Sequence, residues 1–169
     1  MRYFNGFSLK GEESLFKDYL IDSDFTVAGF SYGAIRAFEE VYNSKIRVDR
    51  LILLSPAFFQ NHKKSFIRTQ LRYFKLDRGS YIKEFLKNIA YPSDIKLSSY
   101  LSNGTLDELE YLLLYKWKED RILEVIKRGV TIEVFIGGKD KIIDSKIAFN
   151  FFSKITTTYL LKDKGHILI

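Results

Sequence analysis

The sequence contains no cysteine, and this absence excludes disulfide cross-links and metal sites built on cysteine. None of its 169 residues is cysteine, and only two are histidine. Neither a disulfide framework nor a thiolate metal site can therefore form, and two histidines offer little to an imidazole site. We expect no metal and no cofactor, and a reducing cytoplasm as the natural setting.

Long apolar runs are also missing. No segment approaches the roughly 18 consecutive apolar residues that a membrane-spanning helix needs. The first residues, "MRYFNGF", lack the apolar stretch and the small-residue cleavage site of a secretion signal. We expect a soluble protein that is not exported and has no membrane partner.

Acidic residues are the scarcer charged type. Lys and Arg number 27 against 21 Asp and Glu, which gives a formal net charge of +6. Such a surplus favours an acidic partner. The sequence has no zinc finger, RRM signature or glycine-rich phosphate loop, so we expect no nucleic-acid partner.

What the sequence does contain is an alternation of short apolar segments with longer amphipathic ones. This alternation predicts an α/β fold with a mainly parallel sheet flanked by helices, in one domain of residues 1–169. Several strand candidates are almost continuously apolar, as strands buried on both faces are. The expected strands cover residues 2–4, 25–30, 50–55, 131–137 and 157–161. The expected helices cover residues 11–21, 32–44, 61–76, 79–90, 105–116, 119–128 and 143–153.

Residues 57–118 interrupt the alternation, because their pattern is mostly helical and includes no strand candidate. We expect them to form a helical cap inserted over one edge of the sheet. Since this segment is not expected to hold a core of its own, it is assigned to the same domain. Within it, Thr105 and Glu108 match a capping box, in which the two side chains bond the first N–H groups of a helix reciprocally.

The stretch "GFSYG", at residues 29–33, matches the nucleophile elbow G-x-S-x-G. In that motif the serine occupies a strained turn between a strand and a helix, with its hydroxyl exposed above the sheet. The apolar "FTVA" before the motif and the helical pattern after it provide this setting. Ser31 is therefore a candidate nucleophile. The alternative is an ordinary turn in which Ser31 only caps the helix.

A serine hydroxyl is a weak nucleophile without a base, and the base needs a third group to orient it. Hydrolases with this elbow supply the three in the order Ser, then Asp or Glu, then His. His166 follows the last predicted strand, at the sheet edge where the base is needed. His62, in "NHKK", is interpreted as a solvated surface imidazole.

Three aspartates compete for the role of the acid. Asp140 comes three residues after the predicted strand 131–137, at the same sheet edge, and is the preferred candidate. Asp144 is placed to cap the next helix. Asp163 is close in sequence to His166, which does not suit the usual arrangement.

Acyl transfer also needs backbone N–H groups that bind the oxyanion. The residue after the nucleophile, Tyr32, provides the first. We expect the second from Phe7, in the "FNGF" that ends the first strand, where Gly6 allows the backbone to come close. The alternative is a simple glycine turn.

Taken in order, these motifs resemble those of an α/β-hydrolase shortened at its N-terminus, with a sheet that starts near what is usually the third strand. More closely, the chain resembles the small pimeloyl-acyl-carrier-protein methyl ester esterases of biotin synthesis, of the BioV type. The resemblance runs through "GFSYGAI", "LLSP", "GTLDELEYLL", "IEVFIGGKDKI" and "KDKGH". One departure is "NGF", where a hydrolase often has "HG" followed by an aromatic residue.

This resemblance implies a carboxylesterase that hydrolyses the methyl ester of a pimeloyl chain carried on an acyl carrier protein. Ser31 would attack the ester carbonyl, methanol would leave, and water would release the acid with His166 as acid and base. Two alternatives stay open. One is an acyl thioesterase or small-ester carboxylesterase of the same fold, and the other is a non-catalytic hydrolase-like protein that binds a ligand.

Residues 60–80 give a separate indication of the partner, since they hold six basic residues and one acidic residue. Lys64, Arg68 and Arg72 recur every four residues, so they share one face of a helix. Carrier proteins are acidic, so this face is a candidate docking surface for the acyl carrier protein. The alternative is a solvated basic face without a partner.

Overall fold

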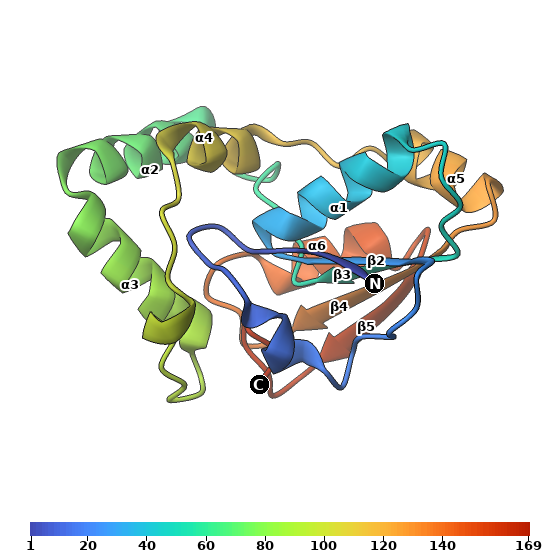
Figure 1. Ribbon diagram of the computed structural model, residues 1–169. Helices are drawn as coiled ribbons and strands as arrows, with labels where there is room; N and C mark the ends of the chain where they lie inside the picture. Colours follow the sequence, from blue (N-terminus) through green and yellow to red (C-terminus); the bar gives the residue numbers. More distant parts are fainter.

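A parallel sheet of five strands forms the centre of the computed structural model, which describes residues 1–169 (Figure 1). The strands are β1 (Arg2–Phe4), β2 (Thr26–Phe30), β3 (Arg50–Leu54), β4 (Thr131–Gly137) and β5 (Thr157–Leu161). They lie side by side in that order, and each neighbouring pair is parallel. Every predicted strand is present, so the prediction of a parallel α/β fold is confirmed.

The strands are apolar because both faces of the sheet are covered. Along β3, Leu51 and Leu53 belong to the larger of two hydrophobic clusters, on one face. Ile52 and Leu54 point the other way, into the smaller cluster. Since successive side chains of a strand point to opposite faces, burial on both sides requires the nearly continuous apolar runs of the sequence.

Different elements cover the two faces. Helices α1 (Tyr32–Asn43), α5 (Glu119–Lys127) and α6 (Ser145–Phe152) lie along one face (Figure 1) and contribute to the larger cluster. The other face is covered by the segment around Phe16, by the end of α3 (Arg78–Ala90) and by the last residues of the chain. No helix is long and apolar enough to cross a membrane.

The helix expected at residues 11–21 is wrong. This segment has only a short 3-10 helix, η1 (Glu12–Phe16), and the residues up to β2 are irregular. Phe16 is fully buried and its ring centroid lies 4.8 Å from that of Phe30. Leu15, Tyr19 and Leu20 of the same segment pack against the smaller cluster as well, so a largely irregular segment covers the sheet without an amphipathic helical face.

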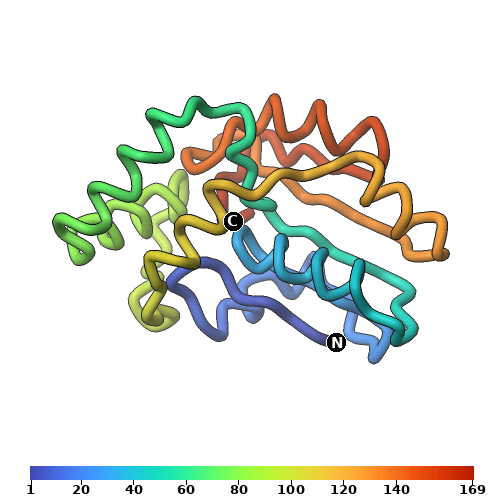
Figure 2. Tube along the Cα trace, turned by 90° about the horizontal axis from the view of Figure 1, so that it is seen from above, coloured from blue at the N-terminus to red at the C-terminus, as the bar shows by residue number.

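The segment 57–118 contains α2 (Lys64–Leu76), α3, a short 3-10 helix η2 (Ser98–Tyr100) and α4 (Leu106–Leu114). These helices stand to one side of the sheet, as the view from above shows (Figure 2). The predicted capping box is confirmed at the start of α4, where Thr105 and Glu108 each accept the other's backbone N–H. Most buried residues of the segment join the larger cluster, which also contains sheet and α1 residues, and those at the end of α3 join the smaller one.

Candidate active site

The turn between β2 and α1 is strained at Ser31. This residue has φ 54° and ψ −113°, a conformation that a non-glycine residue adopts only where its surroundings impose it. A Cβ on Gly33 would lie 1.9 Å from the carbonyl oxygen of Phe4, so the close approach of α1 to the end of β1 requires glycine. Ser31 makes no side-chain capping hydrogen bond, which excludes the alternative of an ordinary helix cap.

The Ser31 side chain lies at one end of a chain of hydrogen bonds. Its Oγ is 2.9 Å from Nε2 of His166, and Nδ1 of the same ring is 2.6 Å from Oδ2 of Asp140. The imidazole is fully buried, and Ser31 is 3% exposed. The three residues follow β2, β4 and β5, whose carboxyl ends meet at one edge of the parallel sheet.

Asp140 is held on both sides of its carboxylate. While Oδ2 faces the imidazole, Oδ1 accepts the backbone N–H groups of Ile142 at 2.6 Å and Ile143 at 3.1 Å. The rival aspartates have other roles. Asp144 caps α6 by accepting the N–H of Ile147 at 3.0 Å.

Asp163, the other rival, pairs with Lys139 at 3.2 Å, and its side chain is 88% exposed. It therefore faces solvent and not the imidazole.

The loop that carries His166 passes close to the cap, since a Cβ on Gly165 would lie 1.6 Å from the carbonyl oxygen of Tyr91. The ring of His166 packs against Phe30, with centroids 5.1 Å apart.

The two expected oxyanion donors both lack a partner in the protein. Tyr32 is the first residue of α1, so its N–H has no acceptor within the helix. The N–H of Phe7 makes no hydrogen bond either. Because Gly33 brings α1 against the carbonyl groups of Phe4 and Asn5, the loop that holds Phe7 begins beside the elbow. The roles of Phe7 and Tyr32 stay predictions.

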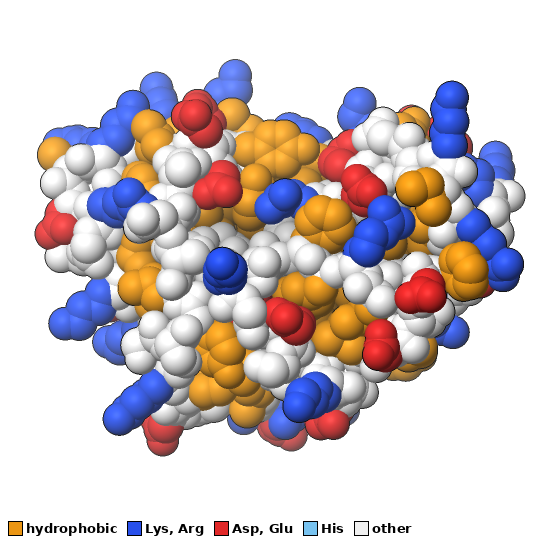
Figure 3. Space-filling view, viewed as in Figure 1, with side chains coloured by type: hydrophobic (Ala, Val, Ile, Leu, Met, Phe, Trp, Pro, Cys, Tyr) orange, Lys and Arg blue, Asp and Glu red, His pale blue; other side chains and the backbone are white.

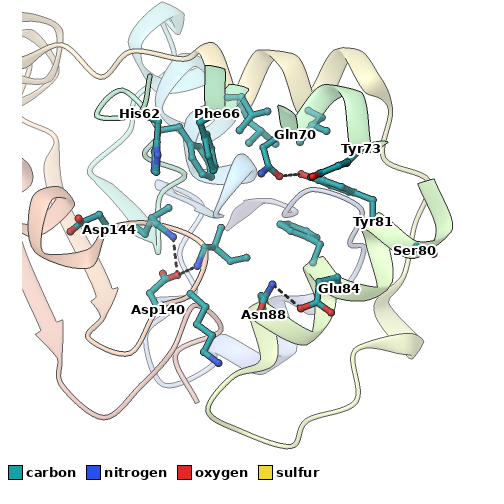
Figure 4. Close-up of a pocket in the computed structure, with 18 of the residues that line it drawn as sticks. His62, Phe66, Gln70, Tyr73, Ser80, Tyr81, Glu84, Asn88, Asp140 and Asp144 are labelled. Carbon is teal, nitrogen blue, oxygen red and sulfur yellow. Dashed lines mark hydrogen bonds between the residues drawn. The ribbon is translucent and has the colours of Figure 1, made fainter. Parts of the chain in front are cut away.

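A cavity of about 720 Å³ opens beside Asp140, between the loop after β4 and the cap helices α2, α3 and α4 (Figure 4). Its wall is mixed in character. The apolar part is formed by Phe59, Phe66, Tyr73, Leu76, Tyr81, Phe85, Leu109, Leu112, Leu113, Ile142 and Ile143. The polar part includes Gln70, whose side-chain oxygen accepts the Tyr81 hydroxyl at 3.0 Å, and the neighbouring Glu84 and Asn88. Burial raises the pKa of Tyr81 to about 12, so this hydroxyl stays a neutral donor.

The interpretation of His62 as a solvated surface imidazole is wrong. Its side chain is half-buried and lines this cavity. The ring stacks on Phe66, with centroids 4.1 Å apart and planes inclined by 20°. Phe66 lies four residues after His62, and the helical turn at the start of α2 brings the two rings together.

The predicted basic face of α2 is free on the surface. Lys64, Arg68 and Arg72 are exposed, and none of them forms an ion pair. Lys and Arg side chains gather along the outer side of this helix in the space-filling view (Figure 3). This face can attract an acidic partner, and its docking role stays a prediction.

The parallel sheet and the strained serine elbow define an α/β-hydrolase fold. No protein-family model matches the sequence, and no curated protein matches it. Solved structures do match. The esterase EaEST from Exiguobacterium antarcticum is 19% identical with a TM-score of 0.56, over 83% of this chain and 59% of its own.

Two further structures of this fold cover more of the chain. The hydrolase olei00960 from Oleispira antarctica is 13% identical with a TM-score of 0.65, over 93% of this chain and 63% of its own. BioG from Haemophilus influenzae is 11% identical with a TM-score of 0.60, over 98% of this chain and 87% of its own. The structural neighbours are thus α/β-hydrolases, among them carboxylesterases.

Proposed function

We propose that this protein is a serine carboxylesterase. The observation that carries the proposal is the continuous chain of hydrogen bonds from Ser31 through His166 to Asp140, set on a strained elbow. A hydroxyl, an imidazole and a carboxylate in this order are the groups that nucleophilic acyl transfer requires. Without such a chain the serine hydroxyl would be unreactive.

The first half of the reaction forms an acyl-enzyme. With Nδ1–H donated to Asp140, Nε2 of His166 is free to accept the Ser31 proton as Oγ attacks the ester carbonyl. Asp140 then stabilises the imidazolium. The N–H groups of Phe7 and Tyr32 donate to the oxyanion, and His166 returns its proton to the departing alcohol.

The second half is hydrolysis of that acyl-enzyme. A water molecule enters where the alcohol left, and Nε2 of His166 takes its proton as the oxygen attacks the acyl carbonyl. Collapse of the tetrahedral intermediate restores Ser31 with its proton and releases the carboxylic acid. Metal and cofactor have no step in this scheme.

The substrate that we propose is the methyl ester of pimeloyl-acyl-carrier protein, with methanol and the pimeloyl-carrier as products in biotin synthesis. Three features support it: the sequence resemblance to BioV-type esterases, the partly apolar cavity beside Asp140 and the unpaired cations of α2. The cavity can take a flexible acyl chain. The basic face can dock an acidic carrier protein at Lys64, Arg68 and Arg72.

The test is incubation of the wild type and Ser31→Ala with pimeloyl-carrier methyl ester, followed by mass analysis of the carrier. We expect a Ser31-dependent loss of the methyl group with the thioester intact. Free carrier thiol would show a thioesterase instead. Intact substrate, together with a Ser31 that a fluorophosphonate does not label, would favour a ligand-binding protein.

A further inference from the structure

A fully buried carboxyl group lies under the loop that follows β1. Glu12, the first residue of η1, has an exposed fraction of 0%. Its Oε1 accepts the N–H of Gly6 at 2.6 Å and, more weakly, the hydroxyl of Tyr3 at 3.4 Å. Its Oε2 is buried and has no hydrogen-bond partner. Burying a carboxyl group without a cation is unfavourable, so the burial of Glu12 must have a structural or functional reason.

Loop closure alone does not supply that reason. The same loop is already closed at the surface, where Gly11 donates its N–H to Oδ1 of Asn5 at 2.9 Å. That bond needs no buried acid. Burial also raises the pKa of Glu12, which shows that the site disfavours the charged form. The hydrogen bond between Glu12 and Gly6 therefore forms although the buried site disfavours a charged Glu12 carboxylate.

Glu12 fixes the Asn5–Gly6 peptide, which adjoins the peptide between Gly6 and Phe7. The N–H of Gly6 is bound to Glu12, and the carbonyl of Gly6 accepts the N–H of Leu9 at 3.1 Å. In a trans peptide the C=O and the N–H point in opposite directions. The N–H of Phe7 is therefore aimed away from the Leu9 side of the turn, and it has no partner within the protein.

We propose that Glu12 is a positioning residue of the esterase: by binding the Gly6 N–H it anchors the Asn5–Gly6 peptide. Together with the hydrogen bond from Leu9 to the Gly6 carbonyl, this anchor sets the next peptide, Gly6–Phe7, so that the Phe7 N–H faces the oxyanion. This inference rests on the proposed function, in which Phe7 is an oxyanion donor. Glu12 touches neither substrate nor reacting atoms. Its effect on the reaction passes through the backbone of Gly6.

The test compares two variants of similar size. Glu12→Gln keeps a side-chain oxygen that can accept the Gly6 N–H, whereas Glu12→Met fills the space without an acceptor and removes the buried acid. Glu13→Ala is the matched control, because the neighbouring Glu13 makes no hydrogen bond or ion pair. The measurements are kcat and KM for a short p-nitrophenyl ester, thermal unfolding, and amide exchange of a peptide that contains residues 5–9.

We expect Glu12→Met to lower kcat by about 10- to 100-fold with KM nearly unchanged, since loss of an oxyanion donor acts on the transition state. Exchange in residues 5–9 should rise in this variant while its Tm stays close to that of the wild type. Glu12→Gln should retain kcat within about twofold and keep the wild-type exchange. Glu13→Ala should change neither quantity.

Three results would overturn the inference. They are a Glu12→Met enzyme with wild-type kcat, a Glu12→Gln enzyme that loses as much kcat as Glu12→Met, and unchanged exchange in residues 5–9 of Glu12→Met. If the wild type shows no Ser31-dependent ester hydrolysis, the proposed function fails by itself. Amide exchange then still decides whether Glu12 holds the loop.

Discussion

At the scale of the residue, backbone strain gathers at the edge of the sheet that carries the site. Ser8, Ser31 and Ser55 have positive φ values of 57°, 54° and 40°. Each lies at or shortly after the carboxyl end of one of three adjacent strands, β1, β2 and β3. Strain of this kind persists only where packing imposes it, and it collects at functional sites. The elbow is therefore built into the folded chain before any substrate arrives.

Removal of the nucleophile or of the base should abolish turnover without unfolding the protein. Ser31→Ala and His166→Ala are each expected to lower kcat by about a thousandfold or more, because the two side chains act as a unit. Ester hydrolysis and circular dichroism would be measured on the same samples. A folded variant that keeps a tenth of the wild-type rate would refute the assigned roles.

The acid is tested by two aspartates that are only four residues apart. Asp140→Asn removes the charge that orients and stabilises the imidazole, and it should lower kcat by about 10⁴-fold, as the corresponding change does in a serine protease. Asp144→Asn is the control, because Asp144 caps α6 and has no contact with His166. Equal losses of kcat in the two variants would contradict the choice of Asp140.

At the scale of the element, an ion pair ties α1 to α5. Glu39 accepts two hydrogen bonds from Arg121, at 2.6 and 2.8 Å, and one from the hydroxyl of Tyr115 at 2.6 Å. The hydrogen bonds from Arg121, followed by that from Tyr115, hold the pKa of Glu39 below its usual value. The helix that begins at the elbow is thereby fixed to its neighbour across the same face of the sheet.

This pair makes stability depend on pH. Because the folded-state pKa of Glu39 is lowered, its contribution is present above the unfolded-state pKa of about 4.3 and is lost as pH falls through the lower folded-state value. Glu39→Gln should reduce the free energy of unfolding by about 1–2 kcal/mol at pH 7. The difference from the wild type should shrink in denaturant titrations towards pH 3.

The control for this prediction is the adjacent Glu40, which pairs with Arg2 at 2.7 Å through side chains that are 41% and 37% exposed. Exposed pairs contribute little, so Glu40→Gln should cost less than about 0.5 kcal/mol at either pH. If Glu39→Gln destabilises the protein equally at pH 7 and pH 3, the effect comes from packing and not from the charge.

The elements that the sequence predicts well are those whose burial follows a simple period. The bounds of β4 agree with the prediction, because its buried residues alternate with less buried ones and the strand ends at Gly137. The bounds of β5 agree as well, although none of its residues is buried, because its apolar end is followed by the charged Lys162. The helix expected at residues 11–21 failed because the apolar residues there pack against the sheet from a largely irregular segment, which periodicity does not distinguish from a helix. The 3-10 helix η2 has too few residues to leave a periodic signal.

At the scale of the whole molecule, parallel topology explains how much of the site was predictable. Residues that follow parallel strands meet at one edge, so Ser31, Asp140 and His166 could be grouped from their positions alone. Glu12 could not, since its contact with Gly6 depends on a turn that no motif marks. The half-buried His62 was missed for the same kind of reason, because its neighbours are set by the packing of α2.

The charge of the whole molecule bears on partner choice. A formal net charge of +6 attracts any polyanion, so tight binding of an acidic carrier would not by itself identify a docking face. Helix α2 carries Lys64, Arg68 and Arg72 on its outer face, whereas Phe66 and Gln70 of the same helix line the cavity. The question is therefore whether the position of the charges matters beyond their sum.

Two triple variants with the same net charge answer this question. Changing Lys64, Arg68 and Arg72 to Glu should raise KM for pimeloyl-carrier methyl ester by about tenfold or more, because like charges then face the acidic carrier. KM for a short p-nitrophenyl ester should not change. The control changes three exposed, unpaired lysines outside α2 to Glu, namely Lys116, Lys127 and Lys154. Equal rises in KM for both triples would show that only net charge acts, whereas a rise confined to the α2 triple would place the carrier on the cap.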